Sequence, residues 1–240
     1  MGNCIVEVVT SSVRSSVEAE KGGAKRIELC GALATAGITP SPGLFLQVKK
    51  QVSIPVFVMI RPREGNFIYS ESEFEVMLEE IKYFRSAGAD GFVFGLLNED
   101  GTVDVERTRI LVDVCEGLPV TFHRAIDVTP DIFQALEDIL STGCKRVLTS
   151  GGAPTGPEGA EVIAELATRA AGRIIIMPGG GIRPDTLATI IHPHITEYHL
   201  SGRLPVISPF QTSIFDMNWA ETDAGEIKKC VEIVGDLNDE

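Results

Sequence analysis

The segment 120–127 places three ionisable side chains directly after an apolar run. Its sequence, VTFHRAID, begins with residues typical of a buried strand and continues into His123, Arg124 and Asp127. In a parallel barrel, polar residues follow a strand where it reaches the active-site end, because the chain leaves the packed core there. An imidazole, a guanidinium and a carboxylate in this position could transfer protons or bind an anion. The segment is therefore a candidate functional site.

Strand parity adds charged residues from other segments. Residues of a strand alternate sides, and the side that faces the helices should be the apolar one. In the segment RIELC (26–30), Ile27 and Leu29 share the outer side, so Glu28 and Cys30 should point into the barrel. Applied to every strand, this reasoning gives a candidate pocket of Glu7, Glu28, Arg61, His123, Thr149, Glu197, His199 and Ser201, with Arg124 and Asp127 at the rim.

These interior charges have two interpretations. Unpaired buried charges are costly, so the set could be an ion-pair network that only stabilises the fold. Alternatively it lines a functional pocket, because catalytic residues of a barrel come from the ends of several strands. The number of polar groups favours the pocket.

Eight short apolar segments alternate with segments of helical spacing. The expected strands are 4–10, 26–30, 56–61, 91–97, 120–124, 146–150, 173–178 and 196–201, and the clearest helices are 73–88, 105–117, 130–143 and 157–172. Short strands separated by helices indicate a parallel sheet, and eight such units in 240 residues predict a closed (β/α)8 TIM barrel. We expect a single domain over residues 1–240, with an irregular segment at about 204–222 before a last helix near 225–234.

Three glycine-containing loops follow strands six, seven and eight. They supply the candidate anion-binding residues Ser150, Gly151, Gly152, Gly179, Gly180, Gly181, Gly202 and Arg203. The loops after the last two strands form the usual phosphate site of this fold, where backbone N–H groups face the ligand. Such glycines also serve as simple turns. Together with the nearby arginines, they favour a small anionic ligand that carries a phosphate or a carboxylate.

Composition excludes several classes of partner. The formal net charge is −13 and no Lys/Arg cluster occurs, so neither nucleic acid nor an anionic membrane is an expected partner. The N-terminus lacks an export signal, and no apolar run is long enough to span a membrane. Five scattered cysteines then indicate reduced thiols in a cytoplasmic protein.

The interior residues could also bind a metal ion. Carboxylates and imidazoles such as Glu7, Glu28, His123 and His199 suit zinc, manganese or iron. Copper(I) prefers sulfur ligands, and parity offers Cys30 with Met59 and Met177. The expected cofactor is therefore left open between copper(I), with Cys30 as its ligand, a divalent metal and none.

Several motifs, in order over roughly residues 3–203, resemble the CutC family, which is named for copper homeostasis. They are RIELC, GITPSPG, VFVMIRPREGNFIYS, GADGFVFGLL, VTFHRAID, RVLTSGG, IMPGGG and TEYHLSG. The resemblance implies a cytoplasmic TIM barrel, a homo-oligomer and a role in copper homeostasis. It carries over onto Glu7, Glu28, Cys30, Arg61, His123, Arg124, Asp127, Ser150, Gly179 to Gly181, His199 and Ser201. Ala36 departs from the family pattern, which has glycine there.

Three functional hypotheses follow. The first is a copper homeostasis protein whose pocket binds metal through Cys30 or the Glu/His cluster. The second is an enzyme, of lyase, isomerase or hydrolase type, that acts on a small phosphorylated or carboxylated metabolite. In the enzyme, His123 or His199 would be the general acid or base, Glu7 or Glu28 a base or orienting group, and Arg61 the anion clamp. The third is a sensor that binds its ligand without turnover.

Overall fold

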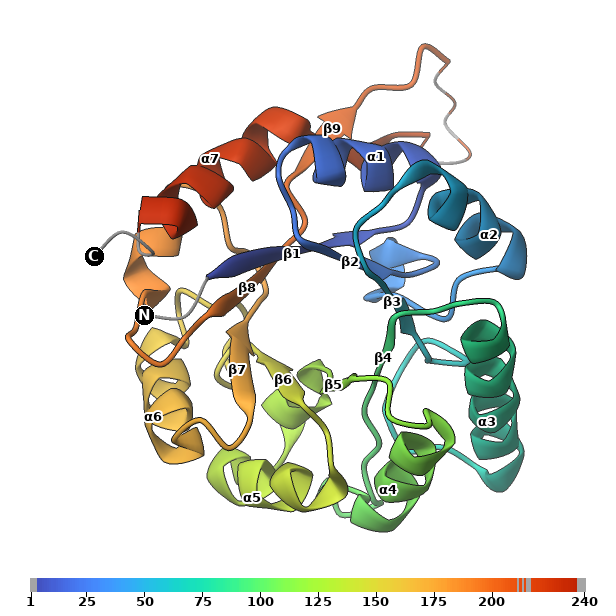
Figure 1. Ribbon diagram of the computed structural model, residues 1–240, viewed down its shortest axis with the longest axis vertical. Helices are drawn as coiled ribbons and strands as arrows, with labels where there is room; N and C mark the ends of the chain where they lie inside the picture. Colours follow the sequence, from blue (N-terminus) through green and yellow to red (C-terminus); the bar gives the residue numbers. More distant parts are fainter. Residues whose placement is uncertain (1–3, 211, 213, 215–216, 237–240) are drawn as a thin grey trace.

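Eight parallel strands form the centre of the computed structural model, with helices arranged around them (Figure 1). The structure describes residues 4–210, 212, 214 and 217–236. The strands are β1 (Ile5–Thr10), β2 (Arg26–Leu29), β3 (Val56–Met59), β4 (Gly91–Phe94), β5 (Val120–Phe122), β6 (Arg146–Thr149), β7 (Ile175–Pro178) and β8 (Glu197–Leu200). From β1 to β7 each strand pairs with its neighbour in sequence, and β8 pairs with β1. The predicted (β/α)8 barrel is confirmed.

Helices connect successive strands. They are α1 (Val13–Lys21), α2 (Pro42–Gln51), α3 (Glu71–Ser86), α4 (Val105–Val114), α5 (Ile132–Thr142) and α6 (Ala160–Ala170), and α7 (Ala224–Asp236) follows the last strand. Local sequence sets their ends: Ser70 and Glu73 form a capping box at α3, and Gly143 ends α5 in the left-handed conformation at φ 93°. The 3-10 turns are η1 (Leu33–Thr35), η2 (Arg124–Val128) and η3 (Leu187–Ile190). The short η3, in a segment with Pro184 and Pro193, takes the place of a helix between β7 and β8.

The strands separate two buried regions: the core between the strands and the helices, and the inside of the barrel. Outward residues such as Val8, Ile27 and Leu29 are fully buried against the helices and belong to the main hydrophobic core. Inside the barrel a much smaller apolar cluster contains Phe57 and Val93. The rest of the barrel interior is largely polar, so it can host a site.

A β-hairpin projects from the barrel beside α1 (Figure 1). It pairs β9 (Arg203–Val206) with β10 (Trp219–Thr222), so the segment predicted to be irregular is ordered at both ends. Its base is fixed because the hydroxyl groups of Ser12 and Ser15 donate to Glu221. Beyond the base, Ile207 is 79% exposed. The last helix lies where it was predicted.

The backbone ladder has one gap. Among the described residues, no strand pairing joins β7 to β8, although every other pair of neighbouring strands is hydrogen-bonded. No helix in the described part of the chain is long and apolar enough to cross a membrane.

Candidate functional site

An ion-pair network fills the lower part of the barrel interior. Arg26 donates to the carboxylates of both Glu7 and Glu197, and Arg146 Nε lies 2.7 Å from Glu197 Oε2. The guanidinium groups of Arg26 and Arg146 lie 4.9 and 5.3 Å from the ring centroid of Phe57. Glu7 and Glu197 therefore belong to this network and do not line the pocket above it.

Sequence reasoning missed both arginines. Arg26 shares strand parity with Glu28 and Cys30, and that parity should have placed it inside. Arg146 shares its side with Leu148, whereas Val147 lies in the helix-facing core. Thr149 therefore lies on the outer side with Val147, and it does not line the pocket.

His199 joins the network to the pocket. Its Nδ1 atom lies 2.7 Å from Glu7 Oε1, and its Nε2 atom lies 3.3 Å from Glu28 Oε2. Burial alone would lower the pKa of His199, but the charges of Glu28 and Glu7 outweigh it and raise the pKa. The two carboxyl groups on either side of His199 thus favour its protonated form.

The two carboxyl groups beside His199 titrate differently. Burial alone would raise the pKa of Glu7, but Arg26 and His199 outweigh it and lower the pKa to about 2. Glu28 has no arginine bound to it, and burial raises its pKa to about 7 against the opposing charge of His199. Glu7 is therefore a fixed anion, whereas Glu28 can gain or lose a proton near neutral pH.

A pocket of about 400 Å³ opens above this pair at the carboxyl ends of the strands. The predicted residues that line it are Glu28, Cys30, Arg61, His123, Arg124, Asp127, Gly180, Gly181, His199 and Ser201. Phe67 and Leu148, which no chemical pattern singled out, are among the apolar residues that line the rest of its walls. The pocket is large enough for a small metabolite.

Arg61 is already bound to the protein. Its Nη1 atom donates to the carbonyl oxygens of Thr35 and Gly37, and Nη2 donates to that of Gly65. The side chain thus ties the loop after β2 to the loop after β3. Three of its five N–H groups are therefore unavailable to the anion that we expected Arg61 to clamp.

His123 begins the 3-10 turn η2, and its Nδ1 atom accepts a hydrogen bond from the Ala125 N–H at 3.2 Å. Burial and the charge of Arg61 lower its pKa to about 3. His123 is consequently neutral at physiological pH. This protonation state argues against the general-base role that the sequence suggested, because Nδ1 is occupied and Nε2 carries the proton.

Asp127 organises the loop after β6. Its carboxylate accepts from the Ser150 and Gly152 N–H groups and from the Thr149 hydroxyl, and it pairs with Arg124 Nε at 2.8 Å. Gly151 N–H donates to Thr149 Oγ1. The amides of Ser150, Gly151 and Gly152 are therefore not free to bind an external anion, contrary to the expectation from their sequence.

Arg124 is a partly exposed cation at the rim of the pocket. Its side chain is 40% exposed, and Nη2 donates to Ser150 Oγ at 2.6 Å. Its Nη1 atom faces Gly180, where an added Cβ would lie only 3.1 Å away. Arg124 and the Gly180–Gly181 backbone therefore lie together at one corner of the pocket.

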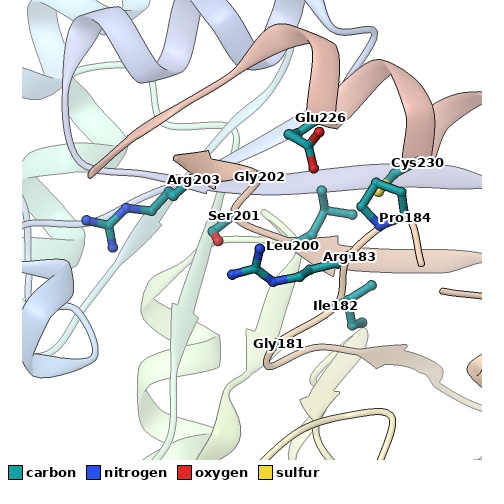
Figure 2. A pocket seen from close by; sticks show the side chains of 10 residues that line it. All are labelled: Gly181, Ile182, Arg183, Pro184, Leu200, Ser201, Gly202, Arg203, Glu226 and Cys230. Carbon is teal, nitrogen blue, oxygen red and sulfur yellow. The ribbon is translucent and has the colours of Figure 1, made fainter. Parts of the chain in front are cut away.

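A second, smaller cavity of about 60 Å³ lies between the loops after β7 and β8. Gly181, Ser201, Gly202 and Arg203 line it, together with Glu226 of α7. Figure 2 shows the Arg183 guanidinium close to Ser201, whereas the Arg203 side chain extends away and donates to the Ala220 carbonyl oxygen. Gly179 lies outside both cavities, and its amide donates to the Thr149 carbonyl oxygen.

The site does not suit copper(I). Among the described residues, Cys30 supplies the only thiol that lines the pocket, since Cys115, Cys144 and Cys230 lie in the helix-facing core and Cys4 packs against it. The Cys30 thiol donates to Glu28 Oε1 at 3.8 Å, and burial raises its pKa well above the ordinary value. A metal ligand must be a thiolate, so this environment disfavours copper binding.

A divalent metal meets a different obstacle. One atom each of Glu7, Glu28 and His199 lies within 4.8 Å of the others, a donor set that zinc or manganese accepts. However, Arg26 already neutralises Glu7, and both ring nitrogens of His199 contact carboxylates. The arrangement of Glu7, Glu28 and His199 therefore suits sharing of a proton among these side chains better than binding of a metal ion.

Comparison with known proteins gives one consistent family. The model of the CutC family matches residues 4–204. The "Copper homeostasis protein cutC homolog" of Homo sapiens is 50% identical over 200 residues, which cover 83% of this chain and 73% of the human protein. A CutC family protein of Xylella fastidiosa is 45% identical over 199 residues, covering 82% and 74% of the two chains.

Solved structures agree. The crystal structure of a CutC protein from Streptococcus agalactiae superposes with a TM-score of 0.78 at 30% identity, covering 82% of this chain and 98% of that one. The aldolase QR15 superposes with a TM-score of 0.63 at 16% identity, covering 82% of this chain and 89% of that one. At that identity the likeness shows the barrel fold alone.

Proposed function

The chain belongs to the CutC family, and from this premise we propose that it is an enzyme that moves a proton on a small anionic metabolite at the mouth of its barrel. The observation that carries the proposal is the contact between Glu28 and His199 at the floor of the pocket. A carboxyl group that titrates near neutral pH can both accept and return a proton during turnover.

Each side chain of the pair has a distinct task. Glu28 takes the proton from the substrate, because its pKa of about 7 leaves a carboxylate available at neutral pH. His199 stabilises the Glu28 carboxylate and is kept in orientation by Glu7, which Arg26 holds ionised. Arg124 at the rim binds the anionic group of the substrate and so selects a charged metabolite.

Two features narrow the chemistry. No lysine lines the pocket among the described residues, so the site is not built for the lysine Schiff base of one class of aldolases. The name of the human relative concerns copper homeostasis. We propose that this chain contributes to copper homeostasis through the metabolite on which it acts, and not by binding a copper ion at Cys30.

Deuterium exchange tests the proposal without knowledge of the full reaction. The protein is incubated in D2O with a panel of phosphorylated and carboxylated carbonyl compounds, and loss of carbon-bound protons is followed by NMR. We expect exchange in at least one compound and a loss of about 100-fold or more in Glu28→Gln, which keeps the side-chain shape but removes the base.

The matched control is Glu80→Gln. Glu80 is another glutamate whose pKa is raised by burial. It is partly buried and accepts a hydrogen bond from the Thr39 hydroxyl, but it lies on α3 outside the barrel. Its replacement should leave exchange unchanged. Equal exchange by Glu28→Gln and wild type, exchange in no compound, or stoichiometric Cu(I) binding that Cys30→Ser abolishes would each contradict the proposal.

A further inference from the structure

Two residues that line the pocket each carry a buried hydrogen-bond donor without an acceptor. Seven buried side-chain polar atoms in the described part of the chain have no hydrogen-bond partner, and Arg61 Nε and His123 Nε2 are among them. Of the residues that carry these atoms, only Arg61 and His123 line the 400 Å³ pocket. Both residues are nearly fully buried, at 3% and 4% exposed. Buried donors normally have a hydrogen-bond acceptor, so two such donors on residues of one pocket indicate that a ligand atom accepts from them.

The donor character of His123 is fixed by its neighbours. Nδ1 accepts from the Ala125 N–H, so a neutral ring carries its proton on Nε2. The nearby Arg61 charge and burial both favour the neutral ring. His123 is thus a neutral N–H donor in the wall of the pocket.

The position of Arg61 is equally fixed. Three backbone carbonyl groups hold its two terminal nitrogens, and Nε is a buried donor without an acceptor. The Phe67 ring supports both donors: its centroid lies 5.1 Å from the Arg61 guanidinium carbon and 4.8 Å from the His123 ring centroid. Gly95 leaves room for the imidazole, because a Cβ there would lie 2.5 Å from His123 Nδ1.

We propose that Arg61 Nε and His123 Nε2 bind one oxygen atom of the ligand and act as an oxyanion hole. The inference rests on the proposed function and names its substrate class: an anionic compound with a carbonyl group next to an acidic C–H. Glu28 takes the proton, the C–H electron pair forms a carbon–carbon double bond, and the carbonyl π pair moves onto the oxygen. The two N–H groups stabilise the resulting enolate, and Glu28 returns its proton to carbon or oxygen.

Oxalate is a suitable probe, because it is a planar dianion that resembles the enolate of a 2-oxo acid. The full-length protein is labelled with ¹⁵N-histidine, which gives signals from only four residues: His123, His192, His194 and His199. On titration with oxalate at neutral pH, we expect the His123 Nε2–H resonance to move downfield and saturate. His194, which is exposed in a loop, should not respond.

A variant measures the strength of the contact. His123→Phe keeps a ring against Phe67 but deletes the donor, and it should weaken oxalate binding about tenfold or more. His123→Asn is a second variant with a side-chain donor, and it should weaken binding less. Folding of both is checked by near-UV circular dichroism, and the titration of the wild type does not depend on either variant.

Failure of the inference can be told apart from failure of the proposed function. An unmoved His123 signal, or equal oxalate affinity in wild type and His123→Phe, overturns the oxyanion hole even if Glu28-dependent deuterium exchange is present. A saturable His123 response in a protein that exchanges none of the panel compounds supports the oxygen site and contradicts the enzyme.

Discussion

The two buried histidines of the barrel interior have opposite electrostatic surroundings. His199 lies between Glu7 and Glu28, so its cationic form is stabilised. His123 lies near Arg61 and accepts a backbone N–H, so its neutral form is stabilised. Pairs of titratable groups whose surroundings drive their pKa values apart are typical of active sites. At the same pH, one group of such a pair is protonated and the other is not.

This contrast predicts a pH dependence of stability. The pKa of His123 is about 3 in the folded protein against an ordinary value of 6.5, so between these values the unfolded chain binds a proton that the folded protein excludes. The stabilising contribution is therefore complete above pH 6.5 and is lost as the pH falls toward 3.

The measurement is urea unfolding at about pH 7 and about pH 5. Wild type should lose about 2 kcal/mol more free energy of unfolding over this interval than His123→Phe does. His194→Phe, at an exposed histidine, is the control and should follow the wild type. Parallel pH profiles for wild type and His123→Phe would show that the imidazole is not kept neutral by the fold.

At the scale of elements, Asp127 links the turn η2 to the loop after β6. The carboxylate replaces the external anion that the sequence SGG suggested, because the fold brings a side chain of its own chain within reach of those amides. Sequence spacing could not reveal this contact, since Asp127 and Gly152 are 25 positions apart.

Replacing Asp127 should loosen that loop. Asp127→Asn keeps the shape but removes the negative charge and one acceptor, so the Ser150 and Gly152 amides should exchange with solvent about tenfold faster. Hydrogen exchange followed by NMR or mass spectrometry checks this result. Asp131→Asn, at the N-cap of α5, is a control that should change exchange at Phe133 and Gln134 instead. Unchanged protection at Ser150 would contradict the assigned role.

Strand parity performed well where one face of a strand is apolar. It placed Glu28, Cys30 and His123 on the inside because their neighbours of opposite parity need to meet the helices. It was misleading at β6, where Thr149 is polar and yet faces outward to bind Asp127. Strand parity predicts the side on which a residue lies but not the groups that it contacts. It therefore could not predict that three backbone carbonyl groups bind Arg61.

At the scale of the whole molecule, the repeated strand and helix pattern predicted the barrel, because eight parallel strands with short crossovers have few ways to close. The replacement of an α-helix by η3 between β7 and β8 depends on local prolines, and the projecting β9–β10 hairpin depends on contacts with α1. A repeat pattern contains neither. The expectation of a homo-oligomer stays a prediction that sedimentation equilibrium can check.

The interior ion network predicts a large cost for its disruption. Arg26→Met would leave Glu7 and Glu197 buried with too little positive charge, so the free energy of unfolding should fall by about 3–5 kcal/mol. The control is Arg173→Met, the same substitution at an exposed ion pair with Glu137. It should leave the free energy of unfolding nearly unchanged. Chemical denaturation of the two variants compares them directly, and equal losses would mean that the buried network contributes no more than a surface pair.

The gap between β7 and β8 gives that network a further consequence. Glu197 of β8 binds Arg146 of β6, and Arg26 of β2 lies 3.4 Å from the Met177 sulfur of β7, so side chains span the line that backbone pairing leaves open. These interior side-chain contacts therefore hold the barrel closed between β7 and β8. Glu7 pairs with Arg26, so protonation of Glu7 at low pH weakens the interaction that holds Arg26 beside β7. We therefore expect acid to open the barrel along this one line before the paired strands separate.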